Sequence, residues 1–467
     1  MTSNPRHGRS IIGTYAEVIS GALLFLVMAF VLRETKGYNH PWVWLMFGSF
    51  SLWALTAWPE RRHQFVAPAL QPERRWAQLL LCITLLLSLH WTNRHAGLMY
   101  WESSPWRQTF QATTAVAFIP AILLVFKILF PTKFLQRISA RLLFTISAAT
   151  IMVALALIPA MSPKPFIDVF LSNTLGIQYL LSGTNPYSAA YPDIYQGIFD
   201  YKLGFLYFPG TLLLQTIAYV AGNDIRFAMM TAHVVSAWLI TRIANSRTHT
   251  NSSWLLAAAW LWFPVVFFVS EQAWSDPLLV AAAALMILAL ERGQFKWAGM
   301  IAGAALATKQ YALLLPFLGF IWLWRAIGFR DAWRFAVSGA VTFALVVGPF
   351  VIWDFQALYD STIANQANPG MRADAMTIWN SLIKYWGFEI PKSLTTLTTI
   401  GCIAGGGLVT WMLGKRGLPA LTYALVLTYG GTFFFGKWAF CNYYYFLAGL
   451  VALHLCWKLP RPDQNVI

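Results

Sequence analysis

Long apolar stretches alternate with short polar links along almost the whole chain. A helix needs about 20 apolar residues to cross the hydrocarbon core of a bilayer, which is roughly 30 Å thick. The pattern therefore predicts an all-α, polytopic membrane protein with about 14 transmembrane helices. The predicted spans are residues 11–32, 41–58, 76–92, 111–131, 142–161, 226–243, 254–270, 277–292, 297–308, 312–326, 332–353, 396–413, 418–436 and 443–458.

One further apolar stretch, residues 205–221, is short and contains Pro209. Lys and Arg concentrate in the cytoplasmic links of membrane proteins. If the N-terminus is cytoplasmic, all the basic links lie on the cytoplasmic side of the membrane only when residues 205–221 do not cross the whole bilayer. We therefore expect it to be re-entrant or interfacial on the outer side, with both termini cytoplasmic. Arg33 and Lys36 violate this charge pattern. The basic residues of the inner links are Arg61, Arg62, Arg74, Arg75, Lys133, Arg137, Arg141, Arg242, Arg247, Arg292, Lys296, Arg325, Arg330, Arg334, Lys415, Arg416, Lys458 and Arg461.

Composition excludes a soluble protein. Hydrophobic residues make up 58% of the chain and charged residues 11%, whereas an average soluble protein is about 25% charged. The formal net charge of +15 could suggest a nucleic-acid partner. However, the basic residues form no continuous patch interleaved with aromatics, so we expect no nucleic acid to bind.

Motifs for metals and cofactors are missing from the sequence. The four cysteines lie in or beside apolar runs without CxxC or CxxH spacing, which is typical of small buried hydrophobic residues. There is no DxD, HExxH, GxxxxGK[ST] or GxGxxG motif in a suitable context. We therefore expect no metal and no cofactor, and a nucleotide-sugar or pyrophosphate donor held through a divalent metal is disfavoured.

The links assigned to the outer side carry carboxylates and aromatic residues. The two longest are residues 162–204 and 354–395. Asp168 follows a span by a few residues, at a depth where a base can meet both a lipid-borne and a water-borne reactant. A helix cap or a solvated loop charge is the alternative. In the segment SEQAWSDP, Asp276 could likewise simply cap the helix that begins at Pro277.

Lys309 interrupts an otherwise apolar region within ATKQYALLLP. Twelve residues of helix precede it and rise only about 18 Å, which is less than the hydrocarbon thickness. Lys309 should therefore lie below the outer surface, in a cavity or paired. An ionisable group at that depth indicates function unless its side chain snorkels to the surface.

Four segments, in this order, resemble the GT-C superfamily of integral-membrane glycosyltransferases. They are FIDVF with GIQYLLSGTNPYS, then FLYFPGTLLL, SEQAWSDPLL and AGMIAGAALATKQYALLLP, and together they cover about residues 165–320. The late segment KWAFCNYYY matches more loosely and lacks the His that some relatives carry. The chain is most similar to bacterial mannosyltransferases that use polyprenyl-phosphate-mannose. In that family the catalytic Asp usually comes just after the first span, whereas here about four additional spans precede that point of the chain. Residues 1–135 are therefore interpreted as an extra N-terminal transmembrane module, and residues 136–467 as the catalytic membrane domain.

The resemblance implies an inverting transfer of a sugar, expected to be mannose, from a polyprenyl-phosphate donor to an acceptor hydroxyl on a glycan, glycolipid or protein. Asp168 would be the catalytic base, and Lys309 and Arg372 would bind the donor phosphate. The candidate substrate-binding residues are Tyr207, Glu271, Trp274, Asp276, Gln310, Tyr311 and Asn442.

The implied location is the bacterial inner membrane, with the site facing the periplasm or exterior. A transporter or lipid-linked-sugar flippase is one alternative, although no internal repeat is evident and the acidic groups gather on one face. An O-antigen-ligase-like transferase with a pyrophosphate-linked donor is another. A non-catalytic membrane scaffold is the third.

Overall fold

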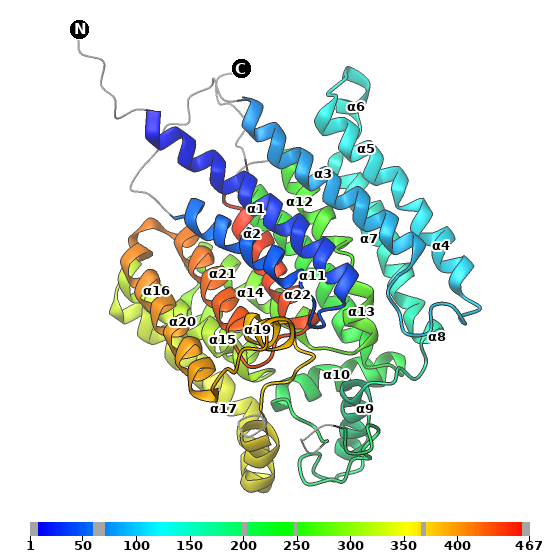
Figure 1. The fold of residues 1–467 in the computed structure, drawn as a ribbon, viewed down its shortest axis with the longest axis vertical. Coiled ribbons are helices and arrows are strands. Elements are labelled where there is room, and N and C mark those ends of the chain that lie inside the picture. Colours follow the sequence, from blue (N-terminus) through cyan, green and yellow to red (C-terminus); the bar gives the residue numbers. More distant parts are fainter. Residues whose placement is uncertain (1–7, 59–70, 199–202, 247–249, 366–369, 460–467) are drawn as a thin grey trace.

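The computed structural model describes residues 8–58, 71–198, 203–246, 250–365 and 370–459. Within these residues the chain is built from helices and contains no strand; Tyr38 and Ala375 form an isolated bridge. The predicted all-α membrane architecture is confirmed (Figure 1). The side chains of five arginines predicted for the inner links lie outside the described part of the chain: Arg61, Arg62, Arg74, Arg247 and Arg461.

The first half of the chain contains α1 (Gly8–Thr35), α2 (Val43–Thr56), α3 (Gln71–Arg94), α4 (Arg107–Val116), α5 (Phe118–Leu129), α6 (Lys133–Arg137), α7 (Ala140–Ala156), α8 (Ile158–Met161), α9 (Asp168–Leu181), α10 (Pro209–Gly222) and α11 (Arg226–Asn245). The second half contains α12 (Asn251–Leu261), α13 (Val266–Glu271), α14 (Asp276–Glu291), α15 (Phe295–Leu306), the 3-10 helix η1 (Gln310–Leu313), α16 (Leu314–Ala326), α17 (Phe329–Tyr359), the π-helix η2 (Asp360–Ala364), α19 (Ile378–Trp386), α20 (Lys392–Leu413), the 3-10 helix η3 (Gly414–Arg416), α21 (Leu418–Phe434) and α22 (Cys441–Leu455).

Six helical segments of the described chain are long and apolar enough to cross a membrane. They are Ala16–Thr35, Arg107–Leu129, Ala140–Met161, Arg226–Asn245, Phe329–Ala364 and Lys392–Arg416. Other predicted spans coincide with shorter apolar helices, among them α2, α15 and α21. The number of fourteen spans stays a prediction. So does the re-entrant position of α10, whose 14 residues rise only about 21 Å.

Large apolar side chains cover much of the outer surface of the helices. Ile352 is 88% exposed, Leu55 80% and Leu345 72%. In the span Phe329–Ala364 only 22% of the most apolar window is buried inside the protein. Such continuous apolar faces would be costly in water, but they are the surfaces that lipid chains cover.

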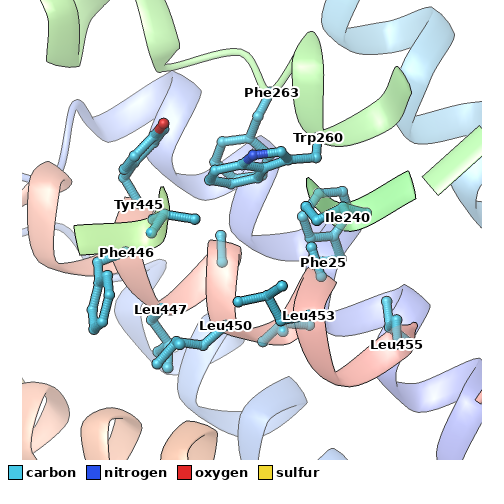
Figure 2. Close-up of a cluster of buried hydrophobic side chains, with 14 of the residues drawn as sticks. Phe25, Ile240, Trp260, Phe263, Tyr445, Phe446, Leu447, Leu450, Leu453 and Leu455 are labelled. Carbon is cyan, nitrogen blue, oxygen red and sulfur yellow. The ribbon is translucent and has the colours of Figure 1, made fainter. Parts of the chain in front are cut away.

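The interior is centred on α22, in which every residue except Tyr443 is buried. Figure 2 shows Tyr445, Leu450 and Leu453 of this helix beside Phe25 of α1, Ile240 of α11 and Trp260 of α12. The indole N–H of Trp260 donates to Ser236 Oγ at 2.8 Å, so the buried polar atom of this large ring is satisfied. The last helix is therefore enclosed by helices from all parts of the chain.

The first helices share this core with the later ones. α1 packs against α22, and α3 packs against α12. Phe25 of α1 and Leu85 of α3 belong to the same buried cluster as Tyr445. The division of the chain at residue 135 stays a prediction, but residues on both sides of it build one interior.

Different helices lie at the two ends of the helical bundle. In Figure 1 the basic helix α6 and the beginning of α3 both lie in the upper part of the molecule, whereas α9 and α10 lie in the lower part. α9 and α19 fall within the two predicted outer segments, residues 162–204 and 354–395. The acidic residue Asp200 of the first segment lies outside the described residues.

Candidate functional site

A cavity of about 660 Å³ lies where many helices end on the side of α9. Its walls come from the turn after α1, the start of α9, the segment before α10, the links after α13 and α15, the segment before α19 and the start of α22. Asp168, Tyr207, Trp274, Lys309, Gln310, Tyr311, Arg372 and Asn442 all line it. The structure therefore brings eight of the ten candidate residues from distant sequence segments to one place, although Glu271 and Asp276 do not line the cavity itself.

Asp168 is the first residue of α9 and is half-buried. The helix follows extended backbone at Ile167, and a carboxylate in the first turn is favoured by the helix dipole. Asp168 Oδ1 accepts a hydrogen bond from the backbone N–H of Val169 at 2.9 Å. Tyr195 lies beside it: its hydroxyl donates to Asp168 Oδ1 at 3.4 Å and accepts from the backbone N–H of Asp168 at 3.2 Å.

The phenol of Tyr195 is a hydrogen-bond donor next to the Asp168 carboxylate. Burial raises the pKa of Tyr195, and the adjacent Asp168 carboxylate raises it further. The phenol therefore keeps its proton at neutral pH and can hold Asp168 in position. Tyr195 was not among the candidate residues that the sequence indicated.

Behind the cavity wall lies a buried network around Asp276. Lys309 Nζ donates to Asp276 Oδ2 at 2.8 Å, and Asn442 Nδ2 donates to the same oxygen at 2.9 Å. The hydroxyl of Tyr311 donates to Asp276 Oδ1. Asp276 is fully buried and Lys309 is 4% exposed. Lys309 is therefore paired as the sequence suggested, and Asp276 is the partner.

The position of Lys309 is fixed by α10. The backbone N–H of Gly210 donates to Ala307 O at 2.7 Å, and the hydroxyl of Thr211 donates to Thr308 O at 2.8 Å. A Cβ on Gly210 would lie 2.5 Å from Ala307 O, so this close approach requires glycine. The first turn of α10 thus ties down the two residues that precede Lys309.

Three tyrosine rings surround the Lys309 ammonium. Its Nζ lies 5.2 Å from the ring centre of Tyr207, 5.1 Å from that of Tyr311 and 5.3 Å from that of Tyr443. The faces of aromatic rings attract cations, and more strongly where water is excluded. Tyr443 was not among the sequence candidates, although it stands next to Asn442 in the segment KWAFCNYYY.

Arg372 lines the same cavity from the segment before α19. Its guanidinium donates two hydrogen bonds to Asp374, from Nε to Oδ1 at 3.0 Å and from Nη2 to Oδ2 at 2.6 Å. The guanidinium carbon lies 4.8 Å from the ring centre of Phe440. This bidentate pair gives Arg372 a defined orientation.

Lys36 also lines the cavity, and the sequence had marked it only as a violation of the charge pattern. It follows α1, and its Nζ lies 5.4 Å from the ring centre of Phe268. Burial lowers the pKa of Lys36, and the Glu271 carboxylate partly offsets this. The available signal was the departure of Arg33 and Lys36 from the charge pattern, because topology alone does not account for basic residues on the outer side.

Glu271 and Gln310 have mainly structural contacts. Glu271 is buried and accepts two hydrogen bonds from the backbone N–H of Met99, at 2.8 and 3.0 Å. Gln310 Nε2 donates to Leu206 O at 2.8 Å and to Thr362 O at 2.9 Å. Glu271 therefore anchors the link between α3 and α4, and Gln310 joins the segments before α10 and within η2.

The cavity combines a carboxylate at its edge with cations and aromatic rings inside. The carboxylate can accept a proton, the cations can stabilise an anion, and the rings can pack against the apolar faces of a sugar. No group of three or more His, Cys, Asp or Glu side chains among the described residues is placed to hold a metal ion. Among the described residues, these features define a helical membrane protein with a polar cavity at the ends of its helices.

Comparisons with known proteins show similarity to glycosyltransferases. The model of glycosyltransferase family 87 matches residues 205–435, just under half of the chain. A segment of 104 residues is 29% identical to GPI mannosyltransferase 1 of Gibberella zeae and covers 22% of this chain and 24% of that protein. The chain thus spans about a quarter of the length of this curated relative. No solved structure matches.

The expected resemblance to membrane glycosyltransferases is confirmed by these matches. Over the segment that holds Tyr207, Asp276 and Lys309, the chain is similar to glycosyltransferase family 87. Asp168 precedes the matched segment and Asn442 follows it.

Proposed function

We propose that this protein is an inverting glycosyltransferase that moves mannose from a polyprenyl-phosphate donor to an acceptor hydroxyl at the outer face of the membrane. One observation carries the proposal: a single cavity is lined by the carboxylate of Asp168 and by the cations Lys36, Lys309 and Arg372. The lipid-exposed helix surfaces around the bundle suit a donor that stays in the bilayer.

In the proposed reaction, the acceptor oxygen attacks the anomeric carbon while Asp168 takes the proton of the attacking hydroxyl. The bond between the anomeric carbon and the phosphate oxygen breaks, and the electron pair leaves with the polyprenyl phosphate. Attack and departure on opposite faces of the sugar invert the anomeric configuration.

The leaving phosphate gains negative charge as its bond to the sugar breaks. Lys309 and Arg372 are proposed to donate hydrogen bonds to the leaving phosphate, and Lys36 adds a further cation to the same cavity. Cations held in advance in a partly dry site stabilise such charge more than water does. Tyr207 and Trp274 are the proposed walls against which the sugar ring packs.

The orientation in the membrane is part of the proposal. The cavity faces the periplasm or exterior of a bacterial inner membrane, and both termini are cytoplasmic. The acceptor is a hydroxyl of a glycan, glycolipid or protein.

The decisive experiment replaces the proposed base. We expect Asp168→Asn to lower the transfer rate by about a hundredfold or more, since general bases contribute about 10²–10⁴ to rates. Expression and donor binding should remain close to those of the wild type. The matched control is Asp360→Asn, which removes an exposed carboxylate bound to Gln356 on the same side of the molecule.

The measurement is transfer of radiolabelled sugar by purified protein, with donor binding followed separately. Near-wild-type turnover in Asp168→Asn would refute the base assignment. A panel of polyprenyl-phosphate sugars and one pyrophosphate-linked donor, assayed in parallel, tests the donor. Transfer from the pyrophosphate-linked donor alone would contradict the proposed substrate, and sugar-lipid transport into proteoliposomes without any transfer product would contradict the reaction.

A further inference from the structure

A second cavity lies at the opposite ends of the helices that build the reaction site. Its volume is about 760 Å³, and it is bounded by the beginning of α7 and the ends of α11 and α14. α14 begins at Asp276, in the buried network behind the first cavity, and ends at Glu291. Its 16 residues correspond to a rise of about 24 Å. This second cavity is therefore separated from the reaction site by most of the bilayer thickness.

Three arginines line this second cavity: Arg141, Arg242 and Arg292. None of them has an ion-pair partner among the described residues, and all are exposed. Glu291 also lines the cavity and accepts a hydrogen bond from Ser246 at 2.9 Å. The cations outnumber the carboxylate, so the cavity favours an anion.

Tryptophans lie beside these arginines. Trp238 and Trp254 line the cavity, and the Arg242 guanidinium carbon lies 5.7 Å from the ring centre of Trp238. Trp238 is 51% exposed. Tryptophan is enriched where headgroups meet acyl chains, because its ring is apolar and its N–H is polar. The cavity therefore has the chemistry of a membrane interface.

An exposed stripe of α11 connects this cavity to an apolar groove. Thr231, Val235, Trp238 and Arg242 are all exposed and lie on one face of the helix. The groove, about 460 Å³, is lined by residues of α10, α11 and α14, and Val235 lines both the groove and the basic cavity. Along α11, Thr231 and Arg242 are separated by about 16 Å, which is half of the roughly 30 Å hydrocarbon core.

We propose that this surface binds one anionic phospholipid of the leaflet opposite the reaction site. Its headgroup phosphate would contact Arg141, Arg242 and Arg292, and an acyl chain would follow Trp238 and Val235 into the apolar groove. The depth of the stripe matches one leaflet, and basic pockets between membrane helices suit anionic headgroups. The site is independent of the proposed transfer reaction.

The test measures lipid retention by the full chain, using native mass spectrometry from nanodiscs that contain phosphatidylglycerol and phosphatidylcholine with identical acyl chains. We expect the wild type to retain phosphatidylglycerol preferentially. Arg242→Gln and Arg292→Gln should each weaken binding about fivefold, and the double variant about 25-fold, since a cation near an anionic surface contributes about 1 kcal/mol. Arg242→Lys should keep most of the preference.

Arg330→Gln is the matched control, because Arg330 is an exposed arginine at the start of α17, away from the cavity. Val235→Trp should fill the groove and weaken binding of long-chain but not of short-chain phosphatidylglycerol. Each variant is first checked for an unchanged melting temperature in detergent. Equal retention of the two lipids by the wild type, or an equal loss in Arg330→Gln, would overturn the proposal. Displacement of phosphatidylglycerol by a polyprenyl phosphate at lower concentration would identify an isoprenoid as the occupant instead and also overturn it.

Discussion

At the scale of single residues, the ion pair of Lys309 and Asp276 is buried, and the proposed function also assigns Lys309 to the donor phosphate. Replacing one residue of the pair would therefore affect stability and the proposed activity together. Both side chains are buried, and they lie 2.8 Å apart. Removing one partner of such a pair leaves a buried charge uncompensated, which typically costs about 3–5 kcal/mol. Loss of activity in a Lys309 variant is therefore informative only when stability is measured as well.

We expect Lys309→Met to lower both the stability and the transfer rate. The double variant Lys309→Met with Asp276→Asn should recover most of the stability, because no buried charge remains unpaired, yet stay inactive for lack of the cation. The measurements are melting temperature in detergent and sugar transfer. Recovery of transfer in the double variant would remove Lys309 from the proposed phosphate site.

At the scale of elements, α15 and α17 approach each other so closely that glycine is required. A Cβ on Gly299 would lie 2.1 Å from Phe335 O, and a Cβ on Gly303 would lie 2.1 Å from Gly339 O. Small residues spaced by four let membrane helices pack with their backbones in contact. α15 ends at Leu306, so this contact also sets where Lys309 stands.

Gly303→Ala should therefore destabilise the protein by about 1–3 kcal/mol, the usual cost of overpacking, and reduce donor use by displacing Lys309. Gly348→Ala is the control within α17, because a Cβ there meets nothing within 4 Å. It should be neutral or stabilise the helix by up to about 1 kcal/mol. The measurement is the thermal unfolding of both variants. Equal stability of Gly303→Ala and Gly348→Ala would contradict the prediction and show that the α15–α17 contact tolerates a methyl group.

At the scale of the whole molecule, the turn after the first helix and the start of the last helix meet at the cavity that Asp168 and Lys309 line. Gly37 follows α1 with φ +73°, and a Cβ there would lie 2.0 Å from the backbone nitrogen of Cys441. Its neighbours are Lys36, which lines the cavity, and, across the contact, Asn442, which donates to Asp276. The turn after α1 is thus part of the cavity wall.

Gly37→Ala should impair both stability and transfer, because it adds a clash with α22 to the cost of a left-handed alanine. Gly183→Ala is the matched control: Gly183 has φ +77°, and nothing lies within 4 Å of its Cβ position. It should lose only about 1–2 kcal/mol, the cost of that backbone conformation alone, and keep its activity. If both variants lose the same stability and Gly37→Ala remains active, the contact between the turn and α22 does not support the site.

The sequence was sufficient for several of these features because they depend on local properties. Apolar length predicted the helices, and the depth of Lys309 followed from helix rise alone. The roles of Lys36, Tyr195 and Tyr443 were missed. Their contacts join different segments of the chain: Tyr195 bonds to Asp168, Lys36 lies beside the ring of Phe268, and the ring of Tyr443 faces Lys309.

The sequence by itself determined the helical membrane class, since a bilayer forces every long apolar stretch to satisfy its backbone as helix. It also indicated that Asp168 and Lys309 could carry chemistry, because charged groups at membrane depth are expensive. Only the tertiary structure decided that Asp276 pairs with Lys309, that Glu271 binds the backbone of Met99 without lining the cavity, and that the turn after α1 forms part of the cavity wall. These outcomes depend on which helix ends meet, and that is set by packing between segments that no local pattern relates.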